Sequence, residues 1–209
     1  MKIGVLIPDR GDRPKLTKHC FKMIERQTLK PDHIEHVNHT PKSNDYDLTE
    51  RVRIGFDHLI SNGCDCVLVM ENDDFYSKHY IEEMVSGWIQ NGKPELFGYN
   101  STTYYHIFKK QYNILSHPNR ASLMNTLISC SVSIEWPADN FVFLDLELWK
   151  QLDGVSVSND KNLCTGIKHG VGLCGGRGHH QMQYPNQDGD SSFLRSIVDE
   201  YSFNFYLGL

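Results

Sequence analysis

The sequence lacks any apolar stretch that approaches the ~20 residues of a membrane-spanning helix. Its apolar start, residues 3–7, is also too short for a secretory signal peptide, so a cytoplasmic location is expected. The net charge of −5 disfavours a broad cationic surface for nucleic acids. The composition is otherwise ordinary for a soluble globular domain. The chain of 209 residues is long enough to bury one full core.

Cysteines at paired, regular spacings are missing as well. The six cysteines are scattered through a chain that is large enough to fold without cross-links, so we expect reduced thiols. Cys64 and Cys66 are separated by one residue, which is closer than the usual zinc-knuckle spacing. Residues 164–180 hold two cysteines and three histidines, and a zinc site there is kept as an alternative, although no pair has the spacing of known structural sites.

Hydrophobic patterning predicts that strands and helices alternate over the first ninety residues. Runs of apolar or alternating residues predict strands at 2–7, 33–38 and 65–70. Apolar residues at three- and four-residue intervals predict helices at 15–27, 48–61 and 77–90. This order predicts a parallel sheet with helices on both of its faces.

The pattern is looser beyond Pro94. It predicts strands at 96–99 and 126–134, a strand-to-helix or short helical element at 141–151, and a last helix within 191–206. There is no internal repeat and no low-complexity linker, so we expect a single domain.

The most informative segment joins the apolar run VLVM, residues 67–70, directly to ENDD, residues 71–74. A short continuous apolar run is typical of a strand buried on both faces, and its carboxyl end is where ligands bind in open α/β sheets. Glu71, Asp73 and Asp74 would emerge there together and repel one another unless a cation neutralised them. Their hard oxygens suit Mg²⁺ or Mn²⁺, which keep positions open for phosphate oxygens. The segment predicts a metal-assisted enzyme that acts on a phosphorylated donor; the alternative is an acidic surface turn.

The order of these features resembles that of the family 2 glycosyltransferases, which have the GT-A fold and use nucleotide-sugar donors. The first strand ends at Pro8, the helix after it ends in QTLKP at 27–31, and ENDD occupies the place of the D-x-D metal motif. LDLELW, residues 144–149, resembles the later Glu-Asp pair before Leu-Trp, with Asp145 in the Asp position. The resemblance covers residues 1–90 and, more loosely, 141–152.

The resemblance implies an α/β fold of GT-A type, with a mostly parallel nucleotide-binding sheet flanked by helices. It implies one domain over 1–209, in which 1–92 bind the nucleotide sugar and 93–209 supply the acceptor and catalytic groups. The implied reaction is an inverting transfer from a nucleotide sugar, with a UDP-sugar as the first choice, to a hydroxyl acceptor with Mn²⁺ or Mg²⁺. The acceptor stays open among a saccharide, a protein, a lipid and a nucleic-acid base.

The resemblance also assigns site residues. Asp145 is the candidate catalytic base, and the candidate metal ligands are Glu71, Asp73 and His180, with His179 as the alternative histidine. The candidate donor-binding residues lie in the loop after the first strand, at the end of the second strand, on the helix at 48–61 and in the acidic segment: Pro8, Asp9, Arg10, Arg13, Asn38, Arg53 and Asn72. Because Arg51 and Arg53 are two residues apart, they do not share a helix face, and at most one of them would reach the donor.

Three positions depart from the family pattern and keep two other functions open. Glu71 replaces the first Asp of D-x-D, Asn38 stands where an acidic residue usually grips the base, and Leu144 replaces the Glu of the later pair. Because of these departures, a non-catalytic nucleotide- or sugar-binding module is kept as an alternative. A sugar-phosphate nucleotidyltransferase is the other alternative, but the loop after the first strand has a single glycine, Gly11, instead of a glycine-rich phosphate loop.

A cluster of aromatic residues follows the first half of the chain. Aromatic faces stack on sugars and bases, so this cluster is a candidate acceptor platform, and ordinary core packing is the alternative. Its members are Tyr104, Tyr105, Phe108 and Tyr112.

Overall fold

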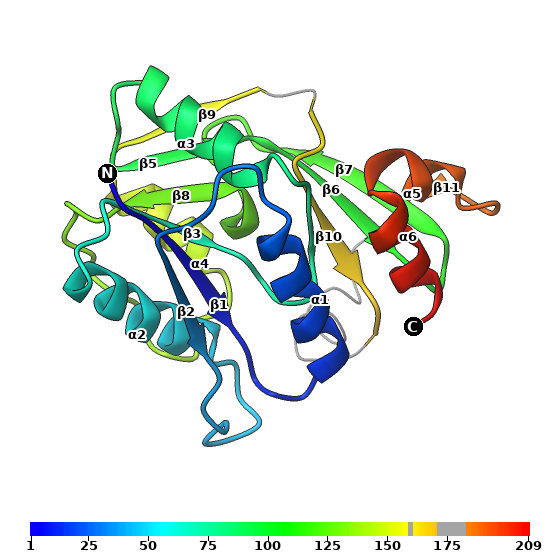
Figure 1. Cartoon of the computed structure of the whole chain (residues 1–209), viewed down its shortest axis with the longest axis horizontal. Coiled ribbons are helices and arrows are strands. Elements are labelled where there is room, and N and C mark those ends of the chain that lie inside the picture. Colours follow the sequence, from blue (N-terminus) through cyan, green and yellow to red (C-terminus); the bar gives the residue numbers. More distant parts are fainter. Residues whose placement is uncertain (159–160, 171–182) are drawn as a thin grey trace.

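The computed structural model describes residues 1–158, 161–170 and 183–209. Two sheets form its framework (Figure 1). The larger sheet has the order β2-β1-β3-β8-β5-β9 and comprises β1 (Ile3–Pro8), β2 (His33–Val37), β3 (Cys66–Val69), β5 (Leu96–Tyr99), β8 (Thr126–Ser129) and β9 (Gly154–Val157). The smaller sheet has the order β11-β7-β6-β10-β4 and comprises β4 (Phe75–Tyr76), β6 (Ser101–His106), β7 (Gln111–Ser116), β10 (Cys164–Lys168) and β11 (Asn186–Gln187).

Helices cover both faces of the larger sheet, as predicted. They are α1 (Pro14–Glu25), α2 (Leu48–Ser61), α3 (Tyr80–Gln90) and α4 (Leu144–Gln151). Successive strand residues point to opposite faces. Val5 and Ile7 of β1 accordingly join a core cluster with α1 and α3, whereas Leu6 joins a second cluster with α2 and α4. This alternation explains why the strand is apolar at every position.

The predicted fold class is confirmed, but the second half of the chain differs from the expectation. Adjacent strands of the larger sheet are parallel except at β8, which runs antiparallel to both β3 and β5. The predicted strand at 126–134 ends at Ser129 because the chain turns away there and packs Trp136 against Phe56 of α2, with ring centroids 5.8 Å apart. The predicted last helix is two helices, α5 (Ser192–Ile197) and α6 (Glu200–Leu207).

The smaller sheet was not predicted from the sequence. Its central strands, β6 and β10, pair in parallel although about sixty residues separate them along the chain. Helices α5 and α6 lie beside this sheet (Figure 1), and the ring of Phe193 stacks on that of Tyr112 with centroids 3.6 Å apart. Among the described helices, which also include the short 3₁₀ helix η1 (Leu123–Asn125), none is long and apolar enough to cross a membrane.

Candidate active site

A cavity of about 370 Å³ lies where the carboxyl ends of β1 and β3 meet the start of α4 and the end of β10. Its polar lining combines carboxylates, cations and the amide of Asn72. These lining residues include Arg10, Arg13, Asp47, Glu71, Asn72, Asp73, Arg120, Asp145 and Lys168. The position agrees with the rule that open α/β sheets bind ligands beyond the carboxyl ends of their strands.

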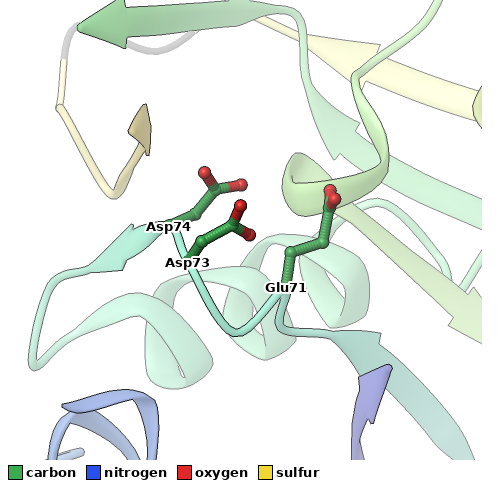
Figure 2. A group of neighbouring side chains, drawn as sticks. All are labelled: Glu71, Asp73 and Asp74. Atoms are coloured by element: carbon green, nitrogen blue, oxygen red, sulfur yellow. The ribbon is translucent and has the colours of Figure 1, made fainter. Parts of the chain in front are cut away.

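Three carboxylates meet directly after β3. Asp74 donates its backbone N–H to the carbonyl oxygen of Glu71 at 3.2 Å, so residues 71–74 form a tight turn. One carboxylate oxygen from each of Glu71, Asp73 and Asp74 lies within 4.8 Å of the others. Figure 2 shows the three side chains rising from this turn. The turn therefore concentrates the negative charge that the sequence predicts at the edge of the sheet.

The three carboxylates differ in their pKa. Burial favours the neutral acid at Asp73, but an ion pair with Arg13 and a 3.0 Å hydrogen bond to Nε2 of His169 hold the pKa of Asp73 well below its usual range. Burial raises the pKa of Glu71 to about 7, and the charge of Asp73 adds to this effect. Burial also raises the pKa of Asp74, although its Oδ1 accepts a 2.9 Å hydrogen bond from the backbone N–H of Ile167.

The donor atoms of this cluster suit a hard divalent cation. Both Arg13 and His169 bind Oδ2 of Asp73. Within the described residues, no hydrogen bond is formed to Oδ1 of Asp73 or to the carboxylate of Glu71. Carboxylate oxygens are the ligands that Mg²⁺ and Mn²⁺ prefer. The residues present therefore fit such an ion.

Asp9 has a different role from the other acidic residues. Its buried carboxylate accepts hydrogen bonds from the backbone N–H of Gly11 and the hydroxyl of Thr17, each at 2.8 Å, and contacts Nε2 of His36 at 2.9 Å. Asn72 also donates its amide to Asp9, at 2.9 Å. These bonds connect the loop after β1 to α1, β2 and the acidic turn. Asp9 therefore does not line the cavity itself but stabilises the segments around it.

The arginines of the first half are held in place by local partners. Arg10 pairs with Oδ1 of Asp47 at 2.7 Å, beside the cavity. Arg51 is 1% exposed and donates to the carbonyl oxygens of Asp9, Val37 and His39 at 2.6, 3.1 and 2.9 Å. Arg53 turns outward and pairs with Asp139 at 2.9 Å.

Asp145 lies in the first turn of α4 and lines the cavity together with Glu71. Nη1 of Arg120 lies 2.5 Å from Oδ2 of Asp145. Burial raises the pKa of Asp145, and the Arg120 guanidinium offsets part of this effect. The result is a partly buried carboxylate with an elevated proton affinity, a property that suits a base.

The structure brings together only part of the predicted site. Pro8, Arg10, Arg13, Asn72, Glu71, Asp73 and Asp145 line the cavity. Asp9, Asn38 and Arg53 do not line it, so their assignment to the donor stays a prediction with no support from their positions. His179, His180 and much of the alternative zinc segment lie outside the described residues.

Sequence reasoning missed Lys168, His169 and Arg120. A signal for the first two exists, because LCTGI at 163–167 is a largely apolar run that ends in a polar pair, just as VLVM does. Arg120 follows no comparable pattern. Of the predicted aromatic platform, Tyr104 lines the cavity, whereas Tyr105 is buried and Tyr112 stacks on Phe193.

The fold is an α/β fold of GT-A-like type, and comparison with solved structures agrees with it. The chain is similar to TarS 1–349 of S. aureus in complex with UDP-GlcNAc, with a TM-score of 0.53, 12% identity, and coverage of 85% of this chain and 61% of that one. It is likewise similar to TarS 1–349 in complex with UDP, with a TM-score of 0.51, 12% identity, and coverage of 80% and 60%.

The chain spans about three fifths of the length of these TarS structures. At such low identity the likeness shows the fold alone. No protein-family profile and no curated protein matches the sequence.

Proposed function

We propose that this protein is a metal-dependent, inverting glycosyltransferase that uses a nucleotide sugar, with a UDP-sugar as the first choice of donor. The observation that supports the proposal most strongly is that Glu71, Asp73 and Asp145 all line one cavity at the carboxyl edge of the sheet. The UDP and UDP-GlcNAc complexes of TarS support this choice of donor, because that protein shares the fold.

Glu71 and Asp73 would hold Mn²⁺ or Mg²⁺ through the oxygens that are free of hydrogen bonds from the described residues. His169, whose Nε2 lies 3.0 Å from Oδ2 of Asp73, would supply the imidazole that the sequence analysis assigned to His180. When bound, the ion would stabilise the charge that develops on the departing diphosphate. The guanidiniums of Arg10 and Arg13 line the same cavity and suit phosphate oxygens.

In the proposed reaction Asp145 takes the proton from an acceptor hydroxyl. The acceptor oxygen attacks the anomeric carbon of the sugar and forms the new glycosidic bond. The bond from that carbon to the phosphate oxygen breaks, and its electron pair leaves with the nucleoside diphosphate. Arg120 fixes the position of the Asp145 carboxylate through their ion pair. The acceptor itself is a saccharide, protein, lipid or nucleic-acid base that presents the hydroxyl.

The test is Asp73→Asn, compared with Asp139→Asn on the surface. We expect UDP to raise the melting temperature of the wild type with Mn²⁺ or Mg²⁺ and to lose this effect in EDTA. Asp73→Asn should abolish the metal-dependent part and lower turnover of a UDP-sugar by about 10²–10³-fold. Asp139→Asn, which removes only the exposed ion pair with Arg53, should behave as the wild type does.

Equal metal-dependent stabilisation in Asp73→Asn and the wild type would reject the metal assignment. Stabilisation by a nucleotide without any turnover of a nucleotide sugar would favour the binding module. Release of pyrophosphate from a nucleoside triphosphate and a sugar phosphate would favour the nucleotidyltransferase instead.

A further inference from the structure

Lys168, the last residue of β10, brings a buried cation to the cavity. Its side chain is 9% exposed. β10 pairs with β6 as far as Lys168, which lies opposite His106, and the carbonyl oxygen of Lys168 accepts a 3.0 Å hydrogen bond from the backbone N–H of Ile107. A residue held on a strand in this way is positioned more rigidly than one on a loop.

The ammonium of Lys168 lies near a carboxylate and an aromatic ring, but it donates no hydrogen bond to a described residue. Nζ lies 4.0 Å from Oδ1 of Asp74, which is too long for a hydrogen bond, and 5.3 Å from the centre of the Tyr104 ring. The ordinary pKa of a lysine lies far above pH 7, so the side chain is a charged ammonium at neutral pH.

An ammonium has three N–H donors, and leaving them unpaired in a buried site costs free energy. Within the described part of the chain, no oxygen or nitrogen accepts a hydrogen bond from Nζ of Lys168. Since this group faces a cavity, a ligand in the cavity could supply the missing acceptors.

The other cations of the cavity differ in this respect. The guanidinium of Arg13 is paired with Asp73, and that of Arg120 with Asp145. Arg10 and Arg51, which also lines the cavity, are both paired with Asp47. Each of these arginines already donates to a carboxylate. Lys168 therefore retains more capacity to bind an incoming anion than they do.

We propose that Lys168 is a catalytic residue that donates hydrogen bonds directly to the diphosphate of the donor, next to the carboxylates of the metal site. This inference rests on the proposed function. Phosphate oxygens are strong acceptors, and an ammonium binds them as a compact point charge. In this place Lys168 would bind the diphosphate in the donor and stabilise the charge that the diphosphate gains as it leaves.

The experiment is titration calorimetry of inorganic pyrophosphate, UDP and uridine, each in EDTA and again with Mn²⁺. Measurements in EDTA separate the contribution of Lys168 from that of the ion. We expect Lys168→Met to weaken the binding of pyrophosphate and UDP by at least about tenfold, because a charge-assisted hydrogen bond is lost. The affinity for uridine, which has no phosphate, should not change. Lys168→Arg should restore part of the loss.

The control is Lys22→Met, which removes an exposed lysine that pairs with Glu25 on α1 and lines no part of this cavity. Its affinities should match those of the wild type. Lys168→Met leaves the carboxylate of Asp74 without its cation and could destabilise the protein. The double variant Asp74→Asn/Lys168→Met removes both charges, and it replaces the single variant in the titrations if that variant is unstable. We expect the double variant to bind pyrophosphate as weakly as the single variant.

The outcomes separate the two proposals. If the wild type binds UDP and pyrophosphate and the Lys168 variants bind them equally well, the role of Lys168 is rejected and the proposed function stands. If the wild type binds neither UDP nor pyrophosphate, with or without Mn²⁺, both proposals are rejected. A similar loss of uridine affinity would show that the substitution disturbs the fold of the site, and would also reject a direct contact with phosphate.

Discussion

Arg51 of α2 and Lys168 of β10 are both buried cations, yet their surroundings differ. The guanidinium of Arg51 donates to three backbone carbonyl oxygens and to Oδ2 of Asp47. The ammonium of Lys168 donates to no described acceptor and faces the cavity. Burial alone therefore does not separate a structural cation from a functional one. The number of hydrogen bonds that the cation donates does separate the two roles, because buried donors in folded proteins are seldom left unpaired without a functional reason.

The partners of Arg51 define what it stabilises. Its side chain binds the carbonyl oxygens of Asp9 and Val37, at the carboxyl ends of β1 and β2, and that of His39 in the loop beyond. Asp9 lies between Pro8 and Arg10, which line the cavity. Arg51 thus holds together the backbone that the resemblance associates with the nucleotide, although its own side chain has little capacity left for a ligand.

The largest effect is expected from Arg51→Met. This change leaves buried carbonyl oxygens and the carboxylate of Asp47 without their donor, and should lower the free energy of unfolding by about 3–5 kcal/mol. Urea unfolding followed by circular dichroism measures it. The matched variant Arg53→Met removes an ion pair with Asp139 in which both side chains are a third or more exposed. It should cost less than about 1 kcal/mol. Equal losses in the two variants would contradict the comparison.

Asp145→Asn should separate activity from stability at a second residue of the cavity. We expect turnover of the donor to fall by about 10²–10⁴-fold, since the base is lost, while UDP binding is retained. The free energy of unfolding should change far less than in Arg51→Met. As a control, Glu147→Gln removes another acidic residue of α4, which pairs with Lys150 at 2.6 Å on the surface. Full turnover in Asp145→Asn would assign the base to another residue.

His19 provides a third case, a buried basic side chain without hydrogen-bond partners and away from the cavity. Neither ring nitrogen has a partner among the described residues, and the ring stacks on Phe205 of α6 with centroids 3.9 Å apart. Burial lowers the pKa of His19 to about 4 from an ordinary 6.5; Arg26 acts in the same direction and Asp199 against it. His19 is therefore neutral in the folded protein near pH 7.

The sign of the resulting pH dependence follows from this lowered pKa. Between pH 6.5 and about 4 the unfolded chain binds a proton at His19 that the folded chain does not, so the free energy of unfolding falls as the pH falls. We expect His19 to contribute a loss of about 2 kcal/mol across this range. Urea unfolding at pH 7.0 and pH 4.5 measures it. His19→Phe should reduce the loss, whereas His58→Phe, on the surface beside Glu35, should keep it.

The sequence predicted those features that depend on neighbouring residues. The strand before Glu71 and the amphipathic helices followed from local periodicity, and the carboxylates were expected at the sheet edge because they follow an apolar run. The smaller sheet depends on pairing between distant segments, such as Thr103 with Thr165, and no local pattern records that pairing. For the same reason the contacts of Arg120 and Lys168 with the site became visible only in the structure.

The antiparallel strand β8 has a consequence for how the chain folds. Its residues pair with β3 on one side, as in Val67 with Ile128, and with β5 on the other, as in Leu96 with Ile128. During synthesis β3 is made about sixty residues before its partner, so the nascent chain has an unpaired, wholly apolar strand edge until β8 emerges. Such edges template wrong pairing between chains. A ribosome-stalled fragment that ends before Thr126 should therefore need a chaperone to stay unaggregated.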